Sequence, residues 1–194
     1  MRNAKRKNEI KAFLIEEFGD AEGTALSVRH AAALDALIGA EKDTSKSRRR
    51  TLAGTILPSI ALYKTLSESS GSKETAYAYV QKYMHRTAEK QHASTARMEA
   101  VPGFYALYSR GFLAVMRASD LWESTQTRGK GFFDVTIRKC LWHTACAENG
   151  CAELCRLFCE ADNVTYGGLK KIGFKRTTTL GCGGNCCDFH FYRK

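Results

Sequence analysis

The 194-residue chain lacks the features that define several protein classes. Its longest apolar runs, such as AAALDALIGA, are interrupted by charge and far shorter than the roughly 20 residues of a membrane span. The basic stretch MRNAKRKNEIKAFLIEEF spaces its apolar residues like a helix face, so it does not match a secretory signal. Internal repeats and low-complexity segments are also absent. We therefore expect a folded, cytoplasmic protein that does not insert into a membrane.

Acidic residues are in deficit, because 20 Asp and Glu stand against 30 Lys and Arg, which gives a formal net charge of +10. Much of the positive charge lies in residues 2–7 and 46–50, with no interleaved aromatic residues and no nucleic-acid-binding motif. The pattern favours a solvated basic surface that modestly attracts small anions. Nucleic-acid binding through Arg48, Arg49 and Arg50 is the weaker alternative, and a homo-oligomer is compatible with the sequence.

Helical periodicity dominates the chain up to about residue 120. Apolar residues recur at three- and four-residue steps in NEIKAFLIEEFGD, which should end at Gly19, and in SVRHAAALDALIGAEKD, where Ser27 is the expected N-cap. Pro58 predicts a kink or a helix start. Residues 121–131 are polar and contain glycine, and they mark the expected boundary between a helical region, 1–120, and a cysteine-rich region, 121–194.

Beyond this boundary the apolar period falls towards two. FFDVTIRKCLW predicts a strand, and CAENGCAELCRLFCEADN predicts one short helix. KKIGFKRTTTLG and CCDFHFYRK predict two more strands, joined by a tight turn at residues 182–185. The expected fold class is α+β, with a helical N-terminal region packed on a small antiparallel β-sheet and one crossing helix, which together form one compact domain.

All eight cysteines lie in the C-terminal third: Cys140, Cys146, Cys151, Cys155, Cys159, Cys182, Cys186 and Cys187. Such clustering in a reducing compartment predicts a site rather than disulfides. Zinc is one interpretation, because several of these cysteines are four residues apart, although no C-x-x-C pair is present. Burial as small apolar residues is a second, which we favour for Cys146, Cys151, Cys182 and Cys186.

A cysteine nucleophile is the third interpretation, and it needs a lowered pKa or a nearby base. His143 and His190 each lie three residues after a cysteine in a predicted strand, so each should point away from that cysteine. Asp162 lies one helical turn beyond Cys159, so the two can face one cleft. Arg176 could bind a substrate carboxylate. Spacing alone favours instead an N-cap role for Asp162 and a surface ion pair for Arg176.

Several short motifs follow one another in a fixed order from Cys140 to the end of the chain. They are Cys140, Glu153-Leu154 followed by Cys159 and Asp162, Arg176-Thr177-Thr178-Thr179, and Gly183 followed by Cys187-Asp188-Phe189. This ordered set resembles the L-2-amino-thiazoline-4-carboxylic acid hydrolase family. LAGTILPSIALYKTL, at residues 52–66, is also similar to the helical half of that family, so the resemblance begins near residue 50.

The resemblance implies metal-independent, cofactor-free hydrolysis of a carbon–nitrogen bond in a small, anionic cyclic amidine, opening its ring to a carbamoyl-cysteine. On this basis Cys187 is the expected nucleophile and Asp162 or Asp188 the expected proton donor. The full catalytic group expected is Cys187, Asp162, Cys159 and Asp188, and the substrate-binding group is Arg176, Thr177, Thr179 and Cys140. Which cysteine attacks stays open. The alternative is a non-catalytic module that binds zinc or a small ligand.

Overall fold

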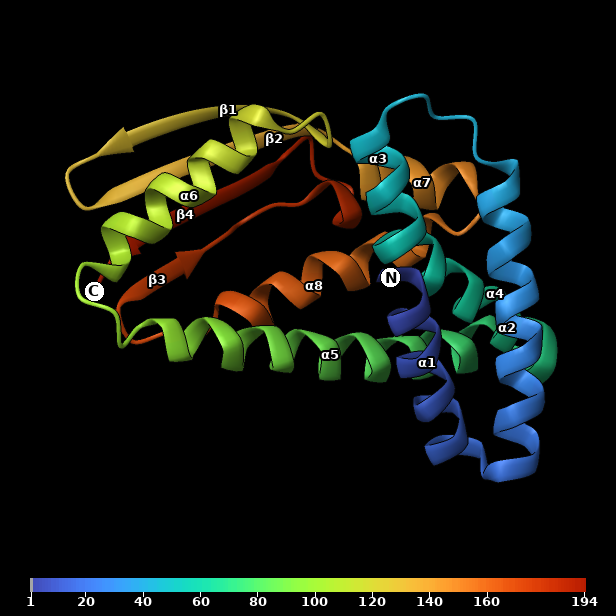
Figure 1. The fold of residues 1–194 in the computed structure, drawn as a ribbon. Helices are drawn as coiled ribbons and strands as arrows, with labels where there is room; N and C mark the ends of the chain where they lie inside the picture. The colour runs from blue at the N-terminus through green and yellow to red at the C-terminus, as the bar shows by residue number, and fades with distance from the viewer. Residues whose placement is uncertain (1) are drawn as a thin grey trace. The chain divides into compact units, whose positions relative to one another are not determined.

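A computed structural model describes residues 2–194 and confirms the α+β fold class, with helices and a four-stranded antiparallel sheet (Figure 1). The chain divides into two units, Met1–Tyr83 and Met84–Lys194. This division falls inside the long helix α5 (Lys73–Met98), whereas the sequence suggests a boundary near residue 121. None of the helices in residues 2–194 combines the length and apolar character needed to cross a membrane.

The N-terminal unit is helical. Its elements before α5 are α1 (Arg2–Phe18), α2 (Asp20–Ala40), α3 (Lys46–Thr51), the π-helical segment η1 (Leu52–Ile56) and α4 (Leu57–Ser70). Gly19 separates α1 from α2 with a φ of 79°, as its predicted role as a stop requires. Pro58 lies in the first turn of α4, at the predicted helix start, and the π-helical segment η1 runs directly into this turn.

The expected N-cap at Ser27 is wrong. Helix α2 already begins at Asp20, and Ser27 lies inside it, where its Oγ donates a hydrogen bond of 2.8 Å to the carbonyl oxygen of Thr24. Asp20 and Glu22 occupy the first turn, where negative charge favours the N-terminus of a helix. This charge starts the helix earlier than the apolar pattern indicates.

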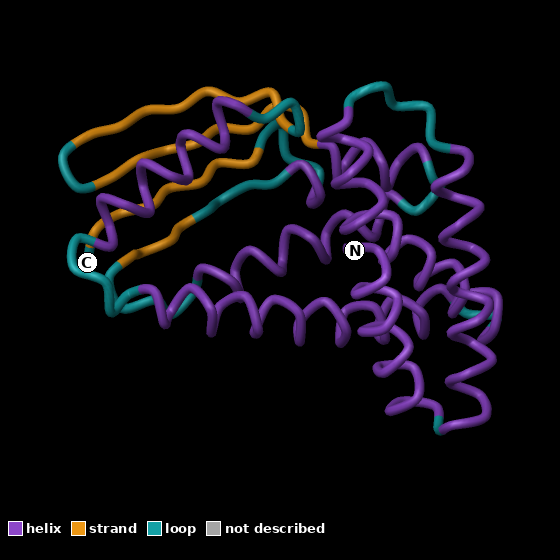
Figure 2. Tube along the Cα trace, in the orientation of Figure 1, coloured by secondary structure: helices purple, strands orange, loops and turns teal. Residues whose placement is uncertain are grey.

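The C-terminal unit joins the sheet to helices on one of its faces. After α5 its elements are α6 (Phe104–Ala118), β1 (Trp122–Gly129), β2 (Phe132–Cys140), α7 (Leu141–Glu148), η2 (Ala152–Leu154), α8 (Cys155–Tyr166), β3 (Ile172–Lys175), η3 (Leu180–Cys182) and β4 (Cys187–Arg193). The strand order is β1-β2-β4-β3, and every neighbouring pair is antiparallel (Figure 2). Strand β4 therefore lies between two strands that precede it in the chain.

One face of the sheet forms the core of this unit. In β2 the residues Phe133, Val135 and Ile137 are buried, and they stand opposite Phe191, Phe189 and Cys187 of β4. Helices α6 and α8 cover this face, because the rings of Phe112 and Tyr166 lie 5.0 and 5.2 Å from the ring of Phe191. The period-two pattern of the sequence thus places the side chains of β2 and β4 correctly.

Two boundaries differ from the sequence prediction. The polar stretch 121–131 is an edge strand, β1, followed by a turn at Gly131, because one face of an edge strand can remain polar and solvated. The single helix predicted after Cys146 is divided into α7, η2 and α8, since Gly150 ends α7 with a φ of 69°. His143 consequently lies in α7 and not in a strand.

The predicted hairpin is correct in its pairing and wrong in its turn. Strands β3 and β4 pair antiparallel, from Ile172 opposite Arg193 to Lys175 opposite His190. Residues 176–186 then leave the sheet as a long connection that contains η3, so Thr177 and Thr179 are not on a strand. The physical reason lies in Asp188, whose carboxylate accepts backbone N–H groups that a strand would have used.

Candidate functional site

A cavity of about 630 Å³ opens in the C-terminal unit, between the buried face of the sheet and helices α6 and α8. Its aromatic lining comprises Tyr108, Phe112, Trp122, Trp142, Phe158 and Phe189. Its other reactive or polar lining residues are Cys140, Cys155, Cys159, Asp162, Tyr166 and Cys187. The cavity is therefore an apolar space with a small group of thiols and one carboxylate in its wall.

Four of the predicted site residues meet in this cavity. Cys140 ends β2, Cys187 begins β4, and Cys159 and Asp162 lie one turn apart on α8. The predicted shared cleft of Cys159 and Asp162 is confirmed. Since Asp162 lies well inside α8, the alternative that it caps this helix is wrong.

The thiol of Cys159 lies among hydrogen-bond donors. The side chains of Cys155 and Cys187 hydrogen-bond to its sulfur and lower its pKa, an effect that outweighs the opposing effect of burial. The Thr179 hydroxyl and the Gly181 N–H lower it further. A sulfur that accepts several hydrogen bonds is stabilised as a thiolate.

The other two predicted site cysteines of the cavity, Cys187 and Cys140, have the opposite tendency. The hydrogen bond of Cys187 to Cys159 is the largest cause that raises the pKa of Cys187, and burial is the second. The Leu180 N–H, whose nitrogen lies 3.4 Å from the Cys187 sulfur, acts to lower this pKa. Burial is the main cause that raises the pKa of Cys140. Of the three cavity thiols that the sequence singled out, Cys159 is the one whose surroundings favour the charged form.

Gly181 is a site residue that the sequence analysis missed. A Cβ at this position would lie 2.8 Å from the Cys159 sulfur and 3.0 Å from the Cys155 carbonyl oxygen, so only glycine lets the backbone N–H approach the thiol. Thr179 caps η3 by accepting the N–H of Cys182 at 3.1 Å, which fixes this backbone. A threonine two residues before a glycine is the signal that could have revealed the turn.

Asp162 has an unusually weak acidity for a carboxyl group. Burial raises its pKa to about 7, and the Cys159 charge adds to this effect, while Arg176 opposes it. Its side chain is 33% exposed and lines the cavity. Near neutral pH the group therefore exists in both protonation states, as a proton donor for catalysis requires.

Arg176 pairs with Asp162, and its own side chain is buried. Its Nη1 donates to Asp162 Oδ2 at 3.1 Å, and its Nη2 donates to the Cys159 carbonyl oxygen at 2.7 Å and to Asn163 Oδ1 at 3.2 Å. The side chain is only 6% exposed, so the alternative of a surface ion pair is wrong. The guanidinium is directed at α8, and Arg176 is not among the residues that line the cavity.

Asp188, Thr177 and Thr179 lie outside the cavity lining. Asp188 alternates with Cys187 along β4, so it points to the other face of the sheet. Burial acts to raise its pKa, but hydrogen bonds from Thr177 and Thr178 outweigh it and hold the pKa below its usual range. Asp188 and Thr177 thus organise the 176–186 connection, and Thr179 reaches the site through the Cys159 sulfur.

The two candidate bases lie outside the cavity lining, and the predicted strand-face argument holds for His190 but not for His143, which lies in a helix. His190 lies three residues after Cys187, on the opposite face of β4, where its Nδ1 is 2.6 Å from Asp134 Oδ1. His143 lies in α7 and is not part of the cavity lining. Neither histidine forms a thiol–imidazole pair with its neighbouring cysteine.

The remaining cysteines divide into two groups. Cys146 and Cys151 are buried, with 0% and 1% exposure, as predicted. The prediction of burial is wrong for Cys182, which is exposed, and for Cys186, which is partly exposed, because both lie in the connection outside the sheet. Within residues 2–194, no three His, Cys, Asp or Glu side chains are grouped so that they could hold a metal ion.

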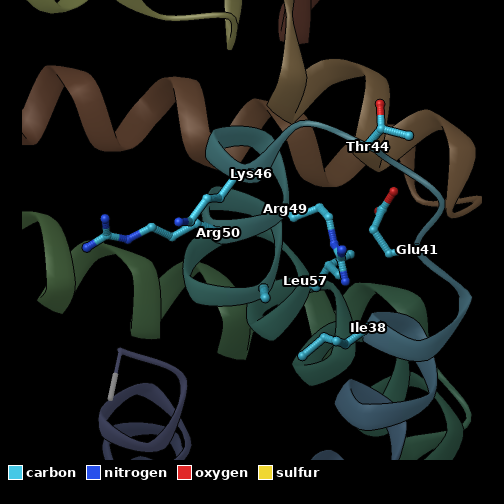
Figure 3. A pocket seen from close by; sticks show the side chains of 8 residues that line it. Ile38, Glu41, Thr44, Lys46, Arg49, Arg50 and Leu57 are labelled. Carbon is cyan, nitrogen blue, oxygen red and sulfur yellow. The ribbon is translucent and has the colours of Figure 1, made fainter.

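The basic block of the N-terminal unit lines a second cavity, of about 520 Å³. Lys46, Arg49 and Arg50 surround it together with Glu41, and Figure 3 shows Arg49 on the side of Glu41 while Arg50 points away. Arg48 pairs instead with Asp43. No cysteine lines this cavity, so the predicted thiol chemistry belongs to the C-terminal unit alone.

Comparison with solved structures finds H-NOX proteins at low similarity. The Fe(II) unliganded H-NOX protein from K. algicida is 12% identical, with a TM-score of 0.34 over 100% of this chain and 97% of its own. The IWP-051-bound H-NOX from Shewanella woodyi is 14% identical, with a TM-score of 0.35 over 98% and 93%. Values this low support no conclusion about fold or function.

No curated protein matches the chain. A family profile does match it: the profile described as L-2-amino-thiazoline-4-carboxylic acid hydrolase aligns with residues 48–191, which is most of the sequence. The aligned segment includes every thiol and carboxylate of the cavity, and it begins where the sequence resemblance begins. The chain therefore belongs to the L-2-amino-thiazoline-4-carboxylic acid hydrolase family.

Proposed function

We propose that this member of a hydrolase family cleaves a carbon–nitrogen bond of a cyclic amidine, with Cys159 as nucleophile and Asp162 as general acid. The observation that carries the proposal is the hydrogen bonding of Cys159, which favours its thiolate one helical turn from a carboxyl group with a pKa of about 7. The sequence analysis gave the nucleophile's role to Cys187. The lowered pKa of Cys159 and the raised pKa of Cys187 favour the exchange of these two roles.

In the first step the Cys159 thiolate adds to the amidine carbon and forms a carbon–sulfur bond. Asp162 gives its proton to the amidine nitrogen, so the tetrahedral adduct carries a neutral leaving group. The carbon–nitrogen bond then breaks, and the carbon stays on Cys159. Asp162 is now a carboxylate.

In the second step water attacks the carbon that is bound to Cys159. The Asp162 carboxylate takes a proton from this water, the carbonyl product leaves, and Cys159 returns as a thiolate. One water molecule is consumed, and both residues recover their starting protonation states. The cycle therefore needs no metal ion, oxidant or other co-reactant.

The other site residues act through these two groups. Cys187, Thr179 and Gly181 stabilise the thiolate before and after the covalent intermediate. Arg176 is a positioning residue, because it fixes Asp162 Oδ2 and, among residues 2–194, nothing donates a hydrogen bond to Oδ1. Oδ1 is thereby left to exchange the proton with substrate.

Replacing single cysteines tests the assignment. We expect Cys159→Ser to lower kcat/KM by at least about 10³-fold on 2-aminothiazoline-4-carboxylate and related cyclic amidines, since it removes the nucleophile. Cys187→Ser keeps a hydroxyl that can donate to the Cys159 sulfur, so its kcat/KM should fall by about 10-fold or less. Exposed Cys182→Ser is the matched control and should be unchanged. Full activity of Cys159→Ser would reject the proposal.

Chemical labelling gives a test that needs no substrate. Brief iodoacetamide treatment at pH 6, followed by peptide mass spectrometry, should alkylate Cys159 before Cys140 and Cys187, because only the thiolate reacts quickly. Preferential alkylation of Cys187 would return the nucleophile's role to that residue.

A further inference from the structure

We infer that the cavity accepts an amidine that carries an apolar, preferably aromatic, substituent and no carboxylate, bound as a cation against Asp162. The inference rests on the proposed function for the reacting group and adds the class of substrate. It replaces the small anionic substrate that the family resemblance implies. Three features of the cavity wall support it: its charge, its aromatic residues and its size.

The charge of the wall is negative. Asp162 is the one Asp or Glu among the described residues that line the cavity, the Cys159 thiolate adds a second negative charge, and no Lys, Arg or His is among them. The basic surplus of the chain therefore does not reach this space. Arg176, which carries the charge nearest in the fold to Asp162, uses its donors on Asp162, Cys159 and Asn163. A substrate carboxylate would lie near Asp162 with no cation to pair with, which is unfavourable in an apolar space.

Aromatic rings form much of the wall. Trp122 and Trp142 are stacked at 5.4 Å with only 7° between their planes, and both are partly exposed and line the cavity. The rings of Tyr108, Phe112 and Phe158 add to this lining. Indole faces attract cations and stack on flat rings, so they suit an amidinium that carries an aryl group.

The size of the cavity points in the same direction. A volume of about 630 Å³ is ample for a drug-sized molecule. A single five-membered ring with one carboxylate would leave most of this apolar space to water. An additional apolar substituent would fill it and remove aromatic surface from water.

The proton count agrees with the proposed chemistry. A neutral amidine that meets protonated Asp162 and an amidinium that meets its carboxylate contain the same number of protons. The two starting combinations therefore lead to the same bound state, in which an amidinium pairs with the Asp162 carboxylate. This pair holds the reacting carbon beside Cys159 and increases its susceptibility to the thiolate.

Tryptophan fluorescence can test binding without turnover, because the chain has two tryptophans and both line the cavity. We would titrate the full-length protein with benzamidine, with benzoate, which has the same ring and the opposite charge, and with acetamidine, which has the charge and no ring. Benzamidine should bind saturably and at least about tenfold more tightly than either. Benzoate binding as tightly as benzamidine, or no saturable benzamidine signal, would overturn the inference.

Two variants separate the charge from the rings. Asp162→Asn should weaken benzamidine binding at least about tenfold, and Trp142→Leu should weaken it several-fold while Trp142→Phe largely restores it. Trp122 still reports binding in the Trp142 variants. Binding by wild type should tighten from pH 6 to pH 8 as Asp162 ionises around its pKa of about 7. Affinity that is indifferent to Asp162→Asn would contradict the cationic mode.

Turnover distinguishes this inference from the proposed function. A 2-aminothiazoline with a phenyl group in place of the carboxylate should be hydrolysed with at least about tenfold higher kcat/KM than the 4-carboxylate. A preference for the carboxylate would overturn the inference and leave the Cys159 mechanism intact. Tight benzamidine binding with hydrolysis of neither compound would instead reject the proposed function and retain the cationic, aromatic specificity of the cavity.

Discussion

Cys159 and Asp162 show how neighbouring groups can shift each other's protonation. Burial favours the neutral form of both, but the hydrogen bonds to the Cys159 sulfur reverse this preference, whereas Asp162 remains weakly acidic. The charge on Cys159 also raises the pKa of Asp162, so a thiolate helps to keep the neighbouring carboxyl protonated. The two residues can thus present a nucleophile and an acid at the same pH.

This coupling predicts a pH profile. Because a substrate that is an amidinium near neutral pH pairs with the Asp162 carboxylate, kcat/KM should rise as pH rises through about 7, the folded-state pKa of this group. Arg176 lowers that pKa, so Arg176→Gln should move the rising limb to higher pH. Arg156→Gln is a matched control, because Arg156 is an exposed arginine of α8, the helix that carries Asp162, and pairs with Glu160. A limb that stays in place or moves to lower pH in Arg176→Gln would contradict this role.

Among the structural elements, the connection between β3 and β4 determines which thiol is activated. Asp188 anchors its start by accepting the N–H groups of Thr177 and Thr178, and Thr179 then caps η3. These contacts bring the Gly181 N–H to the Cys159 sulfur. A strand in this place, as the sequence suggests, would have carried the threonines along the sheet.

Gly181→Ala tests the close approach of this connection. The added Cβ would lie 2.8 Å from the Cys159 sulfur. We expect a loss of about 1–3 kcal/mol in the free energy of unfolding, measured with urea. Iodoacetamide should also react more slowly with Cys159, because the N–H withdraws. Gly39→Ala is the control, because a Cβ at this position of α2 meets open space. This variant should gain up to about 1 kcal/mol in the free energy of unfolding. Unchanged Cys159 reactivity would contradict the role of Gly181.

The sequence could predict the elements whose burial is periodic. The helices around Leu14 and Leu34, the strands β2 and β4, and the shared face of Cys159 and Asp162 all follow from spacing. The connection could not be predicted, because three threonines favour a strand and the Asp188 hydrogen bonds join residues ten or eleven positions apart. The choice of thiolate depends on those same long-range contacts, so the sequence left open which cysteine attacks.

For the whole molecule, the two units differ in the charge of their cavities. The cavity of the N-terminal unit is lined by Lys46, Arg49 and Arg50, and that of the C-terminal unit has a single carboxylate. The net charge of +10 is thus a poor guide to the chemistry of the thiol site. It describes surfaces that are available to any anion.

This distribution predicts the behaviour towards nucleic acid. Binding to duplex DNA should be weak at about 50 mM salt, independent of sequence, and lost by about 200 mM salt, because only counterion release drives it. Replacing Arg49 and Arg50 with alanine should reduce the salt dependence without altering amidine hydrolysis. Gel-shift titrations over a salt series provide the measurement. Binding that survives 200 mM salt or distinguishes sequences would contradict a generic attraction.

The central position of β4 has a consequence for synthesis of the protein. Because β4 lies between β2 and β3 but follows both in the chain, the sheet cannot close on the ribosome until its last strand has emerged. A nascent chain that stops before Cys187 has Cys159 of α8 without the thiol donor that β4 supplies. Cys159 therefore gains the Cys187 thiol as a donor only after β4 has been made and has joined the sheet.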